Sequence, residues 1–212
     1  MSFNEDFMEL YEAISKRKTV RNWQNKDVDI NAIKRIIDAG LKAPTHNHMR
    51  EWEFIVLHTP EEKTKALKFT KEGVEQFKKD NNFDSWPDKT IEQKMYKYAV
   101  PLQYDMLFTA PYVIIPLFRC KNLQAESVDQ LNSFASIWCV IENIFLAATA
   151  EGLGYSMSVP IGKEGKAVCK ELGVPADYMM PVYIGIGYPD NNAPEMEQYR
   201  YTADEKLHFG KW

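Results

Sequence analysis

The stretch I-W-C-V-I-E-N-I-F-L-A-A-T-A-E-G-L-G, residues 137–154, indicates how the chain folds. It belongs to the most apolar helix that the sequence predicts, residues 128–151, which carries one apolar face at helical spacing. Val140 and Leu146 lie off that face, so the helix is apolar nearly all round. Such a helix is expected in the core or in a subunit interface. The G-L-G then ends the helix, and a short strand is expected to follow.

The segments around this helix alternate between helical and strand periodicity, which predicts an α+β or α/β domain. We interpret residues 1–212 as one such domain, because no linker or repeat divides the chain. Pro116 lacks an N–H, so its strand is expected to lie at a sheet edge or to end there. Helices are predicted at 5–17, from Asp29 to 40, from Pro60 to about 79, at 91–108 and at 163–172, and strands at 52–58, 111–118 and 180–188.

The composition excludes several classes of protein. A net charge of −4 and a pI near 5.7 argue against nucleic-acid binding. The N-terminus is polar, unlike a secretory signal, and no apolar run reaches the roughly 18 residues of a membrane span. The three cysteines form no C-x-x-C, and Cys120 and Cys139 are expected to be buried, inert thiols. An odd count without a disulfide pattern favours a reducing, cytoplasmic location.

Common catalytic signatures are absent from the sequence. It contains no G-x-x-x-x-G-K-[ST], no G-x-S-x-G and no H-E-x-x-H. The G-L-G-Y-S-M at 152–157 lacks the third glycine of a dinucleotide fingerprint and follows a helix instead of a strand.

A basic cluster, K-R-K-T-V-R at 16–21, follows the first predicted helix. Arg17, Lys18, Thr19 and Arg21 offer four potential donors within five residues, a set that suits a phosphate dianion. A solvated basic helix terminus, which complements the helix dipole, is the simpler alternative, and the local sequence alone favours it.

A second segment, A-P-T-H-N-H-M-R-E-W-E-F at 43–54, also allows more than one interpretation. His46 and His48 would share one face of a strand, but no third ligand stands nearby, so a zinc site is not expected. The alternatives are a plain turn, in which Thr45 and Asn47 make local hydrogen bonds, and a loop shaped for a flat ligand.

Taken together, four motifs in order resemble the nitroreductase family of FMN-dependent oxidoreductases. They are R-K-T-V-R at 17–21, A-P-T-H-N-H-M-R-E-W at 43–52, G-L-G at 152–154 and G-I-G-Y-P at 185–189. The resemblance spans about residues 8–205. It implies a central, mostly antiparallel sheet flanked by helices in an intertwined homodimer. Residues 189–212 would be a C-terminal extension packing on the partner subunit.

The resemblance also implies roles for particular residues. The first cluster would hold the FMN phosphate, the second loop would lie along the isoalloxazine ring across the dimer interface, and the segment after G-L-G would offer a backbone N–H to flavin N5. A basic residue of the tail would return to the phosphate. The positions that match are Arg17, Lys18, Thr19 and Arg21; Pro44, Thr45, His46 and His48; Pro160, Ile161 and Gly162; and Arg200.

The chain departs from the family pattern near the ring. His48 stands where the family usually has Asn, Arg50 where it has Gln, and Glu51 where it has Pro. The resemblance implies a ping-pong reaction in which NADH or NADPH reduces the flavin and a nitroaromatic, quinone or similar acceptor reoxidises it. A non-catalytic FMN sensor, a reductive dehalogenase and a flavin-degrading enzyme are the alternatives.

Overall fold

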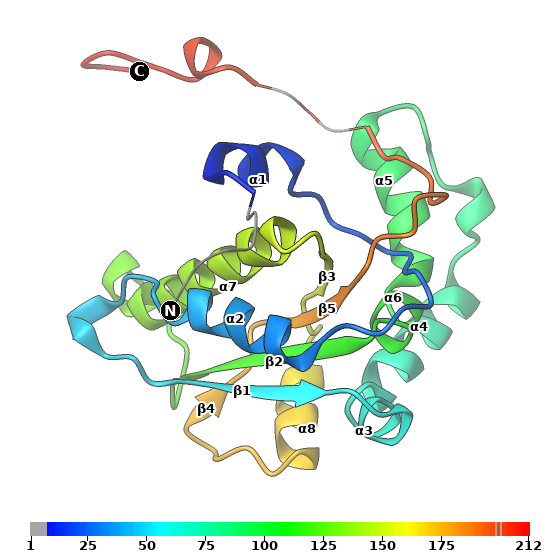
Figure 1. The fold of residues 1–212 in the computed structure, drawn as a ribbon, viewed down its shortest axis with the longest axis horizontal. Coiled ribbons are helices and arrows are strands. Elements are labelled where there is room, and N and C mark those ends of the chain that lie inside the picture. The colour runs from blue at the N-terminus through cyan, green and yellow to red at the C-terminus, as the bar shows by residue number, and fades with distance from the viewer. Residues whose placement is uncertain (1–7, 198, 200) are drawn as a thin grey trace.

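A computed structural model describes residues 8–197, 199 and 201–212. Within them the fold is α+β, with one five-stranded sheet and helices on both of its faces (Figure 1). All strand pairs are antiparallel in the order β1-β2-β5-β3, and β4 pairs with the far end of β2. The expected antiparallel sheet flanked by helices is confirmed. The strands are β1 Trp52–Leu57, β2 Tyr112–Arg119, β3 Gly154–Ser158, β4 Tyr178–Met179 and β5 Tyr183–Gly187.

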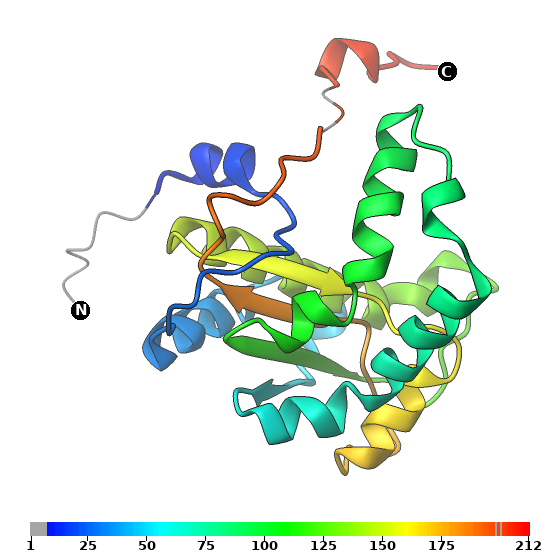
Figure 2. The same ribbon diagram turned by 90° about the vertical axis from the view of Figure 1, so that its right-hand side faces the viewer.

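The two faces of the sheet carry different helices. α2 and α7 cover one face, with α1 lying on α7, whereas α3, α6 and α8 cover the other (Figure 1). α4 and α5 form a hairpin at one end of the sheet, and α5 extends away from the sheet (Figure 2). The helices are α1 Leu10–Lys16, α2 Ile30–Gly40, α3 Pro60–Ala66, α4 Lys68–Asp80, α5 Ile91–Ala99, α6 Asp105–Phe108, α7 Asn132–Ala150 and α8 Glu164–Glu171.

β2 is a central strand, so the prediction that Pro116 would place it at an edge or end it is wrong. β1 pairs with β2 along its other side, and Pro116 lies opposite Phe54. On the β5 side the pairs stop at Ile114 and resume with β4 at Phe118. The proline therefore lies where this second ladder is interrupted, and its missing N–H removes no bond from it.

Two helices predicted as continuous are broken. The first is interrupted at Leu67, whose backbone leaves the helical geometry (φ −94°, ψ 7°) while its side chain is wholly buried. The second is interrupted at Pro101, within a 3-10 turn over Val100–Leu102. At the first break the Leu67 side chain is buried in the core, and at the second Pro101 removes a helical hydrogen bond.

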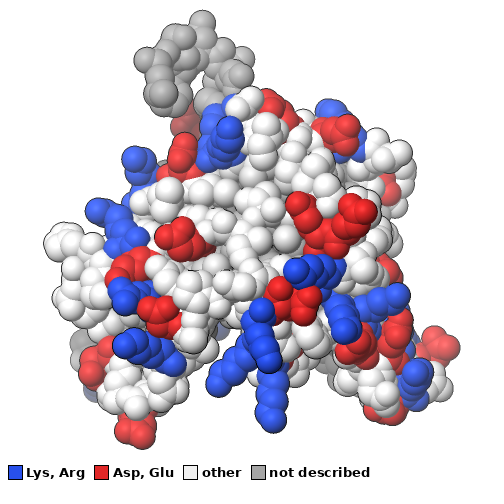
Figure 3. Space-filling view, turned by 90° about the horizontal axis from the view of Figure 1, so that it is seen from below, with Lys and Arg blue, Asp and Glu red and all other residues white. Residues whose placement is uncertain are grey.

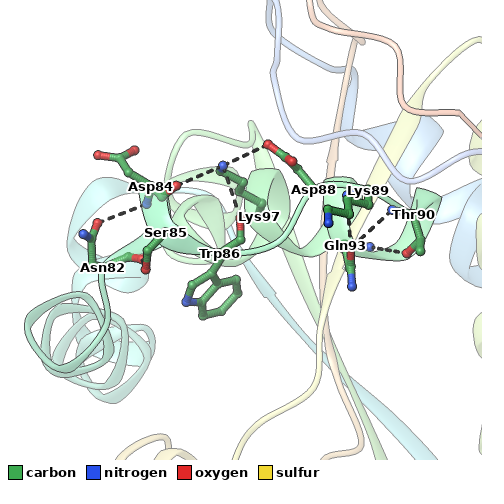
Figure 4. Close-up of polar contacts among 9 residues, drawn as sticks. All are labelled: Asn82, Asp84, Ser85, Trp86, Asp88, Lys89, Thr90, Gln93 and Lys97. Atoms are coloured by element: carbon green, nitrogen blue, oxygen red, sulfur yellow. Dashed lines mark hydrogen bonds and ion pairs between the residues drawn. The ribbon is translucent and has the colours of Figure 1, made fainter.

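The loop that joins α4 to α5 is closed by a lysine. Lys97 of α5 donates to the backbone oxygens of Asp84 (3.2 Å) and Trp86 (3.4 Å) and pairs with Asp88 at 3.1 Å (Figure 4). Thr90 and Gln93 form a capping box at the start of α5. These contacts give the hairpin an ordered tip, although it makes few contacts with the sheet.

α7 is buried on one side only. Its inward face packs against α2 and the sheet, whereas Cys139 on the outer face is exposed, so the expected burial of that thiol is not observed in one subunit. By length and composition the helical stretch Val128–Ala150 would suffice to cross a membrane. The expectation that no stretch is long and apolar enough for a membrane span is therefore wrong, although a helix with one face in a protein core, as α7 has, passes the same test.

α1 presents its apolar residues outward. Leu10 is 59% exposed, Tyr11 86% and Ile14 48%, while only Ala13 is buried against the rest of the subunit. Such a stripe is normally covered in a folded protein.

Candidate functional site

The cationic segment 17–21 is extended and lies along β3, which is an edge strand. The Val20 N–H donates to the carbonyl of Tyr155 at 2.7 Å, and Thr19 bridges the same residue. Further on, the Asp190 N–H donates to the Asn22 carbonyl at 3.0 Å. The segment is therefore clamped between β3 and the chain that leaves β5, which fixes where its side chains can point.

The basic side chains of this segment have different partners. Arg17 donates to the hydroxyl of Tyr155 and lies 3.6 Å from the carboxylate of Glu142 on α7. Lys18 pairs with Glu195 of the tail at 3.0 Å. Because Lys18 and Glu195 are both largely solvent-exposed, their ion pair contributes little to stability.

Arg21 differs from the other cations because it is turned inward. Its Nε is buried and has no hydrogen-bond partner among the described residues. Burial lowers the pKa of the Arg21 guanidinium below its usual value, which nearby Tyr98 and Tyr155 offset in part. A buried, unsatisfied guanidinium N–H is costly unless an acceptor is supplied from outside the chain.

A cavity of about 280 Å³ lies against Arg21. Lys18, Thr19 and Asn22 line it together with Tyr98 of α5, and segment 189–196 closes its other side. Tyr98 donates to the Asn22 side chain at 2.6 Å. Arg21, Lys18 and Thr19 thus place potential donors at one hollow, although Lys18 is already paired with Glu195, which lines the same cavity together with Asp190. Arg17 is not among the residues that line it, so the assignment of segment 17–21 to a phosphate stays a prediction.

The loop 43–50 lies elsewhere in the subunit, at the first turn of α7. The His46 N–H donates to the Ser136 hydroxyl at 3.1 Å, and the Thr45 hydroxyl donates to the carbonyl of Met49. Asn47 and His48 both have positive φ, at 51° and 55°, which turns the loop outward. Pro44, His46 and His48 are exposed, and among the described residues no group of three His, Cys, Asp or Glu could hold a metal ion.

The segment Pro160–Gly162 follows β3 directly. Pro160 has no N–H, and the Ile161 N–H donates to Glu164 Oε2 at 3.0 Å. Gly162, with φ of 58°, keeps an N–H that no described residue accepts. Of the three residues predicted to face the ring, only Gly162 therefore has a backbone donor to offer. Pro160 and Gly162 also line a larger cavity, of about 720 Å³, between α7 and α8.

One subunit connects two of the predicted groups of residues, segment 17–21 and the turn 160–162, through β3. β3 joins the basic segment to the Pro160 turn, since Tyr155 and Pro160 are five positions apart, an extended span of roughly 16 Å. The loop residues 44–48 line neither the cavity beside Arg21 nor the one beside Gly162. Arg200 lies outside the described residues.

Sequence reasoning missed three residues of this site. Tyr155 contacts Arg17 and stacks on Phe145 at 3.7 Å between ring centroids. Tyr98 lines the anion cavity, and Glu164 holds Ile161. The position of Tyr155 directly after G-L-G was the one available signal, whereas nothing in the sequence places Tyr98 near Arg21.

Comparison with known proteins bears on this arrangement. A family model described as the nitroreductase family matches residues 14–188. Iodotyrosine deiodinase 1 of Rattus norvegicus is 26% identical over 199 residues, which is 93% of this chain and 68% of the relative.

Two solved structures share the fold. A crystal structure of oxidized iodotyrosine deiodinase bound to FMN and 3-iodo-L-tyrosine matches with a TM-score of 0.73 and 18% identity, covering 96% of this chain and 100% of the other. An FMN- and NADPH-dependent nitroreductase from Sphigopyxis sp. strain HMH also matches with a TM-score of 0.73, at 17% identity over 97% of this chain and all of the other.

Proposed function

The chain belongs to the nitroreductase family, and on that premise we propose that it is an FMN-dependent oxidoreductase that passes electron pairs from NADH or NADPH to a small organic acceptor. The observation that carries this proposal is the buried Nε of Arg21, which has no hydrogen-bond partner among the described residues and belongs to a side chain that lines the cavity with Lys18 and Thr19. A flavin phosphate would supply that acceptor.

The chain's own residues have separable tasks in this proposal. Lys18, Thr19 and Arg21, which line the cavity, hold the phosphate end, and Arg17 would join them by leaving its present partners Tyr155 and Glu142. β3 sets the distance to the Pro160 turn. There the Gly162 N–H is available to donate to flavin N5. When bound, the flavin supplies the electron-transfer chemistry, which accounts for the absence of a catalytic triad from the sequence.

We also propose that the working unit is a homodimer. The exposed stripe of Leu10, Tyr11 and Ile14 on α1 needs a cover, and a second copy of the chain is one that a family of dimers would supply. In such a dimer the partner's loop 44–48 is proposed to lie near segment 17–21, as the resemblance to the family implies. Of the tail 189–212, segment 189–196 packs on its own subunit, and the end of the tail, with Phe209 and Trp212 almost fully exposed, is proposed to pack on the partner.

The surface agrees with a small-molecule substrate. On the face shown in Figure 3, Lys and Arg lie among Asp and Glu, so that face offers no continuous positive area of the kind nucleic acids bind. The acidic pI and the three free cysteines support a cytoplasmic location.

A second candidate is reductive dehalogenation at the same site. The likeness to iodotyrosine deiodinase 1, across 93% of this chain, favours it. Both candidates use the same bound flavin and differ in the acceptor, so the site residues named above serve either one. Trp86, Phe77 and Phe83 form an aromatic cluster in the α4–α5 hairpin, which projects from one end of the sheet and is proposed to cover an acceptor (Figure 2).

One experiment separates these functions. The protein is purified with FMN, the flavin is reduced anaerobically with NADH, NADPH or dithionite, and its visible absorbance is followed after adding a nitroaromatic, a quinone or 3-iodo-L-tyrosine. Reduction by a nicotinamide and reoxidation by the first two acceptors supports the proposed oxidoreductase. Reduction by dithionite only, with iodide released from 3-iodo-L-tyrosine, supports the dehalogenase. FMN that binds but passes no electrons on indicates a sensor, and failure to bind FMN overturns the proposal.

A further inference from the structure

We infer that Glu164 is a positioning residue, whose carboxylate holds the Pro160–Gly162 turn so that the Gly162 N–H stays directed to the flavin. This inference rests on the proposed function, since it concerns the same site. It assigns a task to a side chain that contacts neither the phosphate residues nor the loop 44–48.

Glu164 accepts hydrogen bonds from three different elements. Its Oε2 accepts from the Ile161 N–H at 3.0 Å, while its Oε1 accepts from the hydroxyls of Tyr183 on β5 (3.1 Å) and Thr70 on α4. Tyr183 is wholly buried and Thr70 is only 5% exposed, so the two hydroxyls form a fixed anchor. The turn is thereby tied to the sheet and to the base of the α4–α5 hairpin.

Apart from the Glu164 carboxylate, the turn is restrained by one backbone hydrogen bond, from the Glu164 N–H to the Ile161 carbonyl at 3.1 Å. Ile161 is 75% exposed and Val159 is 51% exposed, so neither side chain contributes much packing. A Cβ added at Gly162 would meet nothing within 4 Å, which shows that open space surrounds that residue. Without the bond to the Ile161 N–H, the φ and ψ angles around Ile161 would be less restrained, and the direction of the Gly162 N–H would be less fixed.

The arrangement also selects which N–H is available. By accepting from Ile161, Glu164 removes that donor from the ring and leaves the next one, on Gly162, unpaired among the described residues. The chemistry of the anchor suits an ionised carboxylate, since all three partners are donors. Burial raises the pKa of the Tyr183 phenol, so it remains a proton donor throughout the physiological range.

The test compares three variants of the full-length protein loaded with FMN. Glu164→Ala removes all three bonds, Glu164→Gln retains an oxygen for Ile161, and Thr70→Val weakens the anchor without touching the turn. The readouts are the FMN dissociation constant from quenching of flavin fluorescence, the midpoint potential of the bound flavin, and amide exchange at Ile161 and Gly162 without FMN.

We expect Glu164→Ala to weaken FMN binding about threefold to tenfold, the range that loss of one hydrogen bond accounts for. It should also raise the midpoint potential, because N5 accepts an N–H bond only while oxidised. Glu164→Gln should retain most of the wild-type values. In FMN-free protein, Glu164→Ala should speed amide exchange at Ile161 selectively.

The outcomes keep this inference separate from the proposed function. If wild-type protein does not bind FMN, the proposed function fails, while amide exchange still tests the anchor. If wild-type protein binds FMN but Glu164→Ala changes affinity and potential no more than Thr70→Val does, at equal loss of unfolding midpoint, Glu164 is merely structural and the inference is overturned.

Discussion

Gly154 and Gly187 are direct partners in the β3–β5 ladder, and both lie against the segment that carries the basic cluster. A Cβ on Gly154 would come within 2.6 Å of Val20, and one on Gly187 would come within 3.0 Å of Trp23 and 2.6 Å of Pro111. Gly154 of G-L-G is therefore required by Val20 of R-K-T-V-R, whereas Gly187 of G-I-G-Y-P is required by Pro111 and by Trp23, two residues beyond that motif.

We predict that Gly154→Ala displaces Val20 and with it the whole segment 17–21. Overpacking of this kind costs about 1–3 kcal/mol of unfolding free energy, and FMN affinity should fall as well because Arg17 and Arg21 move. Urea unfolding and an FMN titration measure the two effects. The matched control is Gly73→Ala in α4, where an added Cβ meets nothing within 4 Å and helix propensity predicts about 1 kcal/mol of stabilisation.

Arg21→Met should have opposite effects on stability and on binding. It removes a guanidinium whose buried Nε has no partner among the described residues, so the FMN-free protein should gain about 1 kcal/mol of unfolding free energy. Loss of a charge-assisted bond to phosphate should weaken FMN binding about tenfold to a hundredfold. Calorimetry without FMN and a fluorescence titration with it test both. An affinity loss no larger than that of His48→Ala, in the exposed loop, would contradict the phosphate assignment.

The dimer proposal predicts the behaviour of α1. Replacing Leu10, Tyr11 and Ile14 by serine removes apolar side chains that contribute little to a single subunit, because all three are exposed there. We expect the triple variant to sediment as a monomer and to lose FMN, since the partner's loop 44–48 would no longer reach the site. Sedimentation velocity checks the first effect. A variant that remains as dimeric as the wild type would show that α1 does not form the interface.

The start of α3 should make stability depend on pH in the acid range. Glu62 accepts from the N–H groups of His58 (2.8 Å) and Thr59 (2.9 Å), and these bonds lower the pKa of the Glu62 carboxyl below its usual 4.5. A lowered acid pKa contributes stability that is present above about pH 4.5 and is lost as the pH falls through the folded-state value.

Glu62→Gln should therefore lower the urea midpoint at pH 7, and the difference from wild type should shrink below pH 4.5. Thr59→Ala, which removes the other half of the capping box at a cost of about 1 kcal/mol, should lower the midpoint at both pH values. A Glu62→Gln difference that is the same at pH 3 and pH 7 would contradict the role of the carboxylate charge.

The loop at His48 should tolerate asparagine better than histidine. His48 has φ of 55°, in the left-handed region that bulky residues adopt at a cost and asparagine adopts more readily. His48→Asn should raise unfolding free energy by up to about 1 kcal/mol, whereas His48→Val should lower it. Thermal unfolding of the two variants, measured side by side, distinguishes backbone strain from loss of a histidine contact.

The sequence by itself determined the elements whose signals are local. Asp29 accepts from the Asn31 N–H at the start of α2, and the Thr59 capping box starts α3, as their residue types predict. The G-L-G stop after α7 and the strand at 52–57 also agree with prediction. Such signals act over a few residues, so they survive in any tertiary setting, and the four motifs in order were enough to indicate the family.

Tertiary structure decided what depends on contacts between distant residues. Pro116 is accommodated in a central strand because the pairing of β2 with β5 and β4 is interrupted beside it. The helix is interrupted at Leu67 because the side chain of Leu67 is buried in the core. Arg17 meets Tyr155 across 138 positions, and the Nε of Arg21 is buried while Lys18 is exposed. No periodicity encodes these pairings, because each is set by which surfaces the folded chain brings together and how much water it excludes between them.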